Sequence, residues 1–137
     1  MSEKKSAPVN GQKDILLEVR HLKKYFPISK NAFGKTQTYL KAVDDVSFTV
    51  PRGSTLGIVG ESGCGKTTLG RTILHLYDIT GGQVIYDGQD ITKYSSAMLR
   101  KNNLRTRMQI VFQDPYSSLP PRMPVGDIIA EAVKTHS

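Results

Sequence analysis

The stretch GESGCGKTT, residues 60–68, decides how this chain of 137 residues is interpreted. The stretch follows the apolar residues 56–59 and contains three glycines, a lysine and two threonines. Glycine, lysine and threonine contribute little to a hydrophobic core, so packing does not explain their presence. Their spacing matches the phosphate-binding pattern G-x-x-x-x-G-K-[ST] at every fixed position. The stretch therefore predicts a strand, a glycine-rich loop and a helix in succession, with phosphate groups held at the loop.

Each residue type in this loop has a physical reason to be there. Glycines let the backbone turn so that several N–H groups point inward, and a helix N-terminus adds partial positive charge at the same place. We expect Lys66 to reach the β- and γ-phosphates and the Thr67 hydroxyl to ligate Mg²⁺. The alternative is a glycine-rich turn with an incidental lysine, and the flanking strand and helix pattern favours the phosphate site. The predicted binding residues of the loop are Gly60, Glu61, Ser62, Gly63, Cys64, Gly65, Lys66, Thr67 and Thr68.

Composition limits the class of protein. With 38% hydrophobic and 23% charged residues, the chain is typical of a globular domain or part of one. The net charge of +7 suits an anionic partner, although a solvated basic surface is the simpler interpretation. The single cysteine, Cys64, fits a reducing compartment and is expected to be a small filler of the loop without chemistry. No apolar run approaches the length of a membrane span, so we expect a cytosolic chain, at most peripheral to a membrane.

The N-terminal half predicts a flexible tail followed by strands. Residues 1–13 are polar, and residues 15–19 form the first expected strand. A polar, glycine-bearing connection is expected over residues 27–38. Residues 43–50 then alternate apolar and polar side chains, as in a half-buried antiparallel strand, and residues 55–59 are apolar enough for a strand covered on both faces.

The C-terminal half predicts alternating helices and strands. Leu69, Ile73 and Leu76 share one helical face, and Ser95 or Ser96 can cap a helix that carries Leu99 and Leu104. The predicted elements are a helix over 66–76, a strand over 84–86 that enters a tight turn, the capped helix, a strand over 110–112 and a helix over 128–133.

The chain resembles the ATP-binding subunit of ABC transporters, most closely its oligopeptide/dipeptide importer branch. The resemblance is carried by LKAVDDVSF at residues 40–48, by residues 55–68, and by QIVFQDPYSSL at residues 109–119. It implies an α/β P-loop NTPase (ABC ATPase) fold, of which residues 14–137 form the N-terminal portion, with an antiparallel β-subdomain.

The resemblance assigns roles to two further residues. Gln113 matches the Q-loop glutamine, which in the family senses the γ-phosphate and Mg²⁺ where the ATPase meets its permease. Without the family, it is a polar residue that leaves a strand. Phe26 matches the aromatic residue that stacks on adenine, with Tyr25 as the other candidate. The alternative for Phe26 is an aromatic side chain that covers the edge of the sheet.

The function implied by the resemblance is ATP binding, with Mg²⁺, and ATP hydrolysis that drives peptide import in an intact cassette. The implied partners are a second ATPase subunit, two membrane permease subunits and an extracytoplasmic solute-binding protein, with no nucleic acid. The implied location is the cytoplasmic face of the cell membrane. Importers of nickel or glutathione share these motifs, so they remain alternatives for the solute.

Several family features are missing from these 137 residues. There is no signature motif Leu-Ser-Gly-Gly-Gln, no Walker B strand and no switch histidine, and Asp114 is a poor substitute because Pro115 follows it. Pro120 and Pro124 stand where relatives commonly carry Asn and Thr. The expectation is a chain truncated after the Q-loop, with no catalytic residue identifiable beyond Lys66 and Gln113.

Two rival functions belong to other classes. The first is a nucleotide-binding fragment without turnover. The second is a nucleic-acid binder, which is disfavoured because the basic residues are not interleaved with aromatic ones and are better explained as a solvated face. The residues concerned are Lys23, Lys24, Arg100, Lys101, Arg105 and Arg107.

Overall fold

The computed structural model describes residues 14–114 and 124–136. They divide into two compact units, Met1–Tyr94 and Ser95–Ser137, which are described separately below. The predicted flexible tail, residues 1–13, lies outside the described residues.

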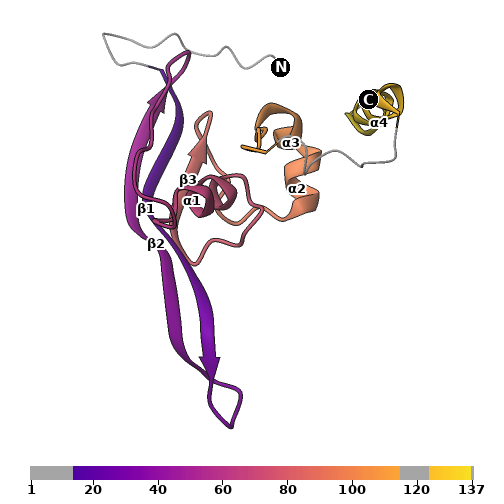
Figure 1. Ribbon diagram of the computed structural model, residues 1–137. Helices are drawn as coiled ribbons and strands as arrows, with labels where there is room; N and C mark the ends of the chain where they lie inside the picture. The colour runs from indigo at the N-terminus through magenta and orange to yellow at the C-terminus, as the bar shows by residue number, and fades with distance from the viewer. Residues whose placement is uncertain (1–13, 115–123, 137) are drawn as a thin grey trace. The chain divides into compact units, whose positions relative to one another are not determined.

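The first unit is built on a four-stranded antiparallel sheet (Figure 1). Its strands are β1 (Ile15–Lys30), β2 (Thr36–Pro51), β3 (Gly81–Tyr86) and β4 (Gln89–Asp90), in the order β2-β1-β3-β4. Strands β3 and β4 are joined by Asp87 and Gly88, both with positive φ, as expected for a two-residue hairpin turn. The predicted antiparallel β-subdomain and this tight turn are therefore confirmed.

Two compensating bulges keep the apolar face of the sheet in register. Val19 and Leu22 are both fully buried although they are three residues apart, because one extra residue is inserted in β1 around His21. A second extra residue in β2 around Asp45 restores the pairing. His21 and Asp45 both have positive φ, and His21 Nδ1 lies 2.6 Å from Asp45 Oδ1.

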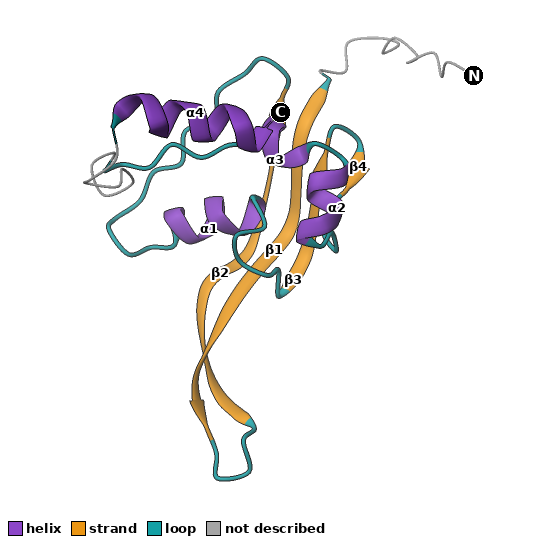
Figure 2. Ribbon diagram, turned by 90° about the vertical axis from the view of Figure 1, so that its right-hand side faces the viewer, coloured by secondary structure: helices purple, strands orange, loops and turns teal. Residues whose placement is uncertain are grey.

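Beyond the sheet, β1 and β2 continue as a two-stranded arm, which we define as residues 25–41. Strand β3 pairs with β1 only between Leu17 and Lys23, whereas β1 and β2 pair as far as Lys30 and Thr36 (Figure 2). The predicted connection over residues 27–38 is therefore wrong in length, since only residues 31–35 lie outside the strands. Backbone pairing between the strands overrides the polar sequence, and it tolerates Pro27 because β3 does not reach that edge of β1.

Helix α1 (Lys66–Ile73) buries its apolar face within this unit. Leu69, Thr72 and Ile73 are its buried residues, and they form a core with side chains of the sheet such as Val19, Leu22 and Val84. The buried Thr72 hydroxyl donates to the carbonyl oxygen of Thr68 at 2.7 Å, so this hydroxyl has a hydrogen-bond partner. The helix begins where predicted and ends three residues earlier, because Leu74 leaves helical geometry.

Two predicted strands are not strands. Residues 55–59 and 110–112 have no regular secondary structure, and Val59 and Val111 are 94% and 97% exposed. A strand requires a hydrogen-bonded neighbour, and within residues 14–114 and 124–136 no segment pairs with either. Apolar composition alone could not supply that neighbour.

The described residues of the second unit form the helices α2 (Ser96–Lys101), α3 (Leu104–Arg107) and α4 (Val125–His136). Ser95 caps α2 as predicted, its side chain accepting from the N–H of Met98 at 3.3 Å. The single helix expected to carry Leu99 and Leu104 is split because Asn103 adopts a left-handed conformation. The predicted C-terminal helix is confirmed and is longer than expected.

No helix in the described part of the chain is both long and apolar enough to cross a membrane.

Candidate nucleotide-binding site

The glycine-rich loop leads directly into helix α1. Gly65 is the N-cap residue, with φ of 98°, and its carbonyl oxygen accepts the first helical hydrogen bond, from Leu69 at 2.8 Å. No side chain caps the helix, and its first turn contains no acidic residue. The N–H groups of that turn have no partner inside the helix, so they remain suited to an anion.

Close contacts surround two of the glycines, with backbone at Gly65 and with a side chain at Gly60. A Cβ atom on Gly65 would overlap the carbonyl oxygen of Ala42, so the loop approaches the backbone of β2 more closely than any side chain allows. A Cβ atom on Gly60 would lie 2.5 Å from Cys64 Sγ. The loop is thus folded tightly on itself and against β2.

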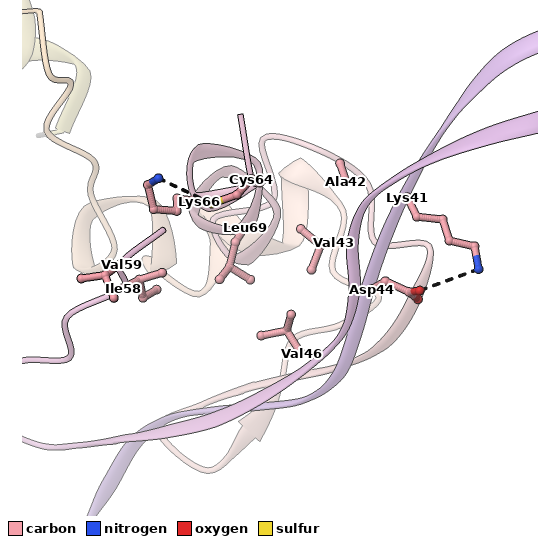
Figure 3. A pocket seen from close by; sticks show the side chains of 11 residues that line it. Lys41, Ala42, Val43, Asp44, Val46, Ile58, Val59, Cys64, Lys66 and Leu69 are labelled. Carbon is pink, nitrogen blue, oxygen red and sulfur yellow. Dashed lines mark hydrogen bonds and ion pairs between the residues drawn. The ribbon is translucent and has the colours of Figure 1, made fainter. Parts of the chain in front are cut away.

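Lys66 points back across the loop instead of into solvent (Figure 3). Its ammonium donates to the carbonyl oxygens of Gly60 and Glu61, the second at 2.7 Å, and Nζ lies 3.5 Å from Cys64 Sγ. These partners are neutral, so no carboxylate holds the cation there. An arriving phosphate can therefore recruit the ammonium by a charge-assisted hydrogen bond.

Thr67 and Thr68 occupy the first turn of α1. Thr67 is exposed, which leaves its hydroxyl accessible for a cation beside bound phosphates, whereas Thr68 is half-buried. No group of three or more potential metal-ligating side chains occurs among the described residues. The exposed hydroxyl of Thr67 is a ligand of the kind that holds Mg²⁺ jointly with phosphate oxygens in nucleotide sites.

A cavity of about 390 Å³ lies between β2 and the loop (Figure 3). Residues 41–44 and Val46 line it from β2, and Leu69 and Cys64–Lys66 line it from the other side together with Ile58 and Val59. This volume is within the range of small-molecule sites. None of the residues that line the cavity from β2, Ala42 and Asp44 among them, was predicted from the sequence as a site residue, since only the folded hairpin brings them to the loop.

Asp44 is fixed at the cavity wall by β1 and β2 together. Its carboxylate accepts from the Tyr25 hydroxyl, and Lys41 Nζ lies 3.7 Å from Asp44 Oδ2. The Tyr25 hydrogen bond, followed by the charge of Lys41, lowers the pKa of Asp44 below its ordinary value. The same hydrogen bond raises the pKa of Tyr25. The Tyr25 hydroxyl is therefore already engaged, which leaves Phe26 as the better candidate for stacking on the adenine base.

Phe26 packs on a residue that the sequence did not suggest. Its ring meets that of Tyr77 edge to face, with centroids 5.4 Å apart and planes at 89°, and Lys24 Nζ lies 4.8 Å from its centroid. The ring is half-buried and does not line the cavity. Its adenine-stacking role stays a prediction.

Gln113 and Asp114 belong to the second unit. Both are exposed and lie outside the helices. The Q-loop role of Gln113 stays a prediction, and Pro120 falls outside the described residues. Pro124 directly precedes α4, which begins at Val125. A proline is tolerated there because the start of a helix needs no N–H group from that residue. The carbonyl oxygen of Pro124 accepts a hydrogen bond from the N–H of Asp127 at 3.0 Å.

The six basic residues considered for nucleic acid are divided between the units. Lys23 and Lys24 are half-buried in β1, whereas the four others belong to α2 and α3 of the second unit. The ammonium of Lys24 lies over the rings of Phe26 and Tyr77. This basic residue is therefore already engaged in cation–π contacts within the chain.

Comparisons with known proteins agree on one family. Residues 43–136 match the family model described as ABC transporter. The chain is 50% identical over 127 residues to the oligopeptide transport ATP-binding protein AppF of Bacillus subtilis, covering 93% of this chain and 38% of that protein. It is 47% identical over 116 residues to the dipeptide transport ATP-binding protein DppF of Escherichia coli, covering 85% and 34%. The chain thus spans little more than a third of these relatives.

Solved structures give the same fold. A nucleotide-free ATP-binding cassette from an ABC transporter matches with a TM-score of 0.51 and 30% identity, covering 64% of this chain and 30% of that one. A dimeric bacterial ABC transporter cassette matches with a TM-score of 0.61 and 22% identity, covering 79% and 42%. The predicted P-loop NTPase fold is confirmed.

Proposed function

The chain belongs to the ABC transporter family, and we propose on that premise that it binds MgATP at the loop of residues 60–68. The observation that carries the proposal is the loop itself: an uncapped helix N-terminus, a backbone packed too tightly against β2 for a side chain at Gly65, and a lysine held only by neutral groups. The backbone N–H groups would surround the phosphates.

Within this site, each side chain has a distinct task. Lys66 would exchange the carbonyl oxygens of Gly60 and Glu61 for oxygens of the β- and γ-phosphates, and Thr67 would ligate Mg²⁺. The metal would neutralise phosphate charge. Gln113 would join the metal and the γ-phosphate, and Phe26 would stack on the adenine.

The transport role follows from the relatives. Proteins named as oligopeptide and dipeptide transport ATP-binding proteins suggest that the intact cassette uses ATP hydrolysis to drive peptide import. Its partners would be a second ATPase subunit, two permease subunits and a solute-binding protein, with the chain peripheral on the inner face of the cell membrane. Nickel and glutathione remain the alternative solutes.

The test is a comparison of Lys66→Ala with Lys101→Ala, an exposed lysine of the second unit. Calorimetric titration with MgATP should show at least a tenfold loss of affinity for Lys66→Ala, because the mobile cation that faces the phosphates is removed. Lys101→Ala should bind as the unaltered chain does. Equal affinities in all three proteins would refute the site.

A further inference from the structure

The arm, residues 25–41, exposes apolar side chains that nothing in the first unit covers. Ile28 is 63% exposed and Phe33 91%, and Tyr39 and Leu40 are more than half exposed. Phe33 lies in the turn and the other three lie in a ribbon of only two strands, since β3 ends its pairing with β1 at Lys23. Apolar residues that are exposed together, unlike single ones scattered over a surface, mark interaction sites.

The turn at the end of the arm is ordered so that it presents Phe33. The side chain of Asn31 accepts from the N–H groups of Phe33 at 3.1 Å and Lys35 at 2.8 Å. Asn31 N–H also donates to the carbonyl oxygen of Lys35 at 2.8 Å, and Gly34 N–H to that of Asn31 at 2.9 Å. Four hydrogen bonds therefore fix the turn while the Phe33 ring projects, so docking costs little ordering entropy.

The charge of the arm has one sign. Its sequence holds three lysines, at positions 30, 35 and 41, and no aspartate or glutamate. The nearest acid along β2 is Asp44, at the base of the arm, where it is engaged with Lys41 and Tyr25. An aromatic and aliphatic end flanked by lysines suits the boundary between lipid headgroups and acyl chains.

We infer that the arm is a docking element for an anionic lipid surface, with Phe33 and Ile28 entering the interfacial layer and the exposed Lys35 facing the headgroups. A second copy of the chain fits less well, because strand pairing between two arms would bring lysines together. Nucleic acid fits less well because the aliphatic side chains of Ile28 and Leu40, exposed beside the aromatic ones, contribute nothing to base stacking. This role is independent of nucleotide binding.

Flotation of the chain with lipid vesicles tests the inference. The chain should float with phosphatidylcholine vesicles that contain phosphatidylglycerol, float poorly with pure phosphatidylcholine, and be released by salt. Lys35→Glu removes one positive charge and adds a negative one, so the partition coefficient should fall by about 25-fold, at about fivefold for each unit of charge. Lys101→Glu makes the same change in the second unit and should have little effect. Equal losses in both variants would show an effect of net charge alone and overturn the inference.

A fluorescence probe tests insertion of the tip directly. The chain contains no tryptophan, so Phe33→Trp introduces a single reporter at a position where an exposed ring is already accommodated. Its emission should shift to the blue on addition of the anionic vesicles, whereas Val125→Trp, at an exposed residue of α4, should not shift. An unshifted Phe33→Trp, or a chain that ignores vesicles and binds RNA through Lys35, would overturn the inference. Lys66→Ala should float like the unaltered chain, so failure here is distinct from failure of the nucleotide site.

Discussion

Gly65 is the residue where the loop, helix α1 and strand β2 meet. Its positive φ of 98° starts the helix, and its missing side chain lets the carbonyl oxygen of Ala42 approach the loop. Gly63 also has a positive φ, of 80°, but a Cβ atom there would meet nothing within 4 Å. A comparison of substitutions at the two glycines therefore distinguishes the effect of backbone strain from the effect of steric overlap.

Gly65→Ala should accordingly be far more damaging than Gly63→Ala. Both variants bear the strain of a left-handed residue, about 1–2 kcal/mol, but only Gly65→Ala must also displace β2. We expect Gly65→Ala to lose MgATP binding and to melt at a lower temperature than Gly63→Ala, as measured by calorimetry. Similar behaviour of the two variants would mean that the contact with Ala42 is unimportant.

Phe26 gives a second prediction at this scale. If its ring stacks on the base, Phe26→Ala should weaken ATP and GTP by similar amounts, about 1–3 kcal/mol, because stacking does not depend on the hydrogen-bonding edge of the base. Phe33→Ala, which removes an exposed ring from the end of the arm, is the matched control for equilibrium nucleotide binding. Unchanged affinities in Phe26→Ala would assign the ring to packing on Tyr77 instead.

At the scale of elements, the hairpin of β1 and β2 does most to build the site. Its bulges at His21 and Asp45 keep Val19 and Leu22 in the core while β2 runs beside the phosphate loop. The hydrogen bond from Tyr25 in β1 to Asp44 in β2 holds the cavity wall in place. The pKa of Asp44 reports on this link between the strands.

Tyr25→Phe should raise the pKa of Asp44 toward its ordinary value, because the hydrogen bond that stabilises the carboxylate is lost. Since the folded-state pKa of Asp44 is lowered, its contribution to stability is present above its unfolded-state pKa. That contribution is lost as the pH falls through the folded-state value. Carbon NMR titration of the Asp44 carboxyl group measures the change, with Tyr39→Phe as control. Titration of Asp44 at the same pH in all three proteins would contradict the link.

At the scale of the whole molecule, the proposed phosphate-binding loop supplies only part of what ATP hydrolysis needs. Phosphoryl transfer requires a water molecule positioned in line with the γ-phosphate, in addition to charge neutralisation. Asp44 is the carboxylate that lines the cavity in the described residues, and it is engaged by Tyr25 and Lys41.

The purified 137-residue chain should therefore release phosphate from ATP no faster than Lys66→Ala does, although it binds the nucleotide. A phosphate-release assay on the two proteins, with Lys101→Ala alongside, measures this. A rate clearly above that of Lys66→Ala would point to Asp114 as a carboxylate that acts in hydrolysis, and Asp114→Asn should then abolish it.

Local sequence by itself determined the features that depend on neighbouring residues. The glycine spacing before Lys66 predicted the loop and the start of α1, Asp87 and Gly88 predicted the hairpin turn, and Ser95 predicted the cap of α2. Each of these is fixed by backbone sterics or by a hydrogen bond within a few residues.

Tertiary structure alone decided what depends on partners distant in the sequence. Residues 55–59 and 110–112 are as apolar as strands, but a strand forms only where another backbone pairs with it, and none does among the described residues. Conversely, the polar residues of the arm are strands because β1 and β2 pair with each other. The approach of Ala42 to Gly65, the bond from Tyr25 to Asp44 and the packing of Tyr77 on Phe26 likewise join distant segments, so no local pattern could show them.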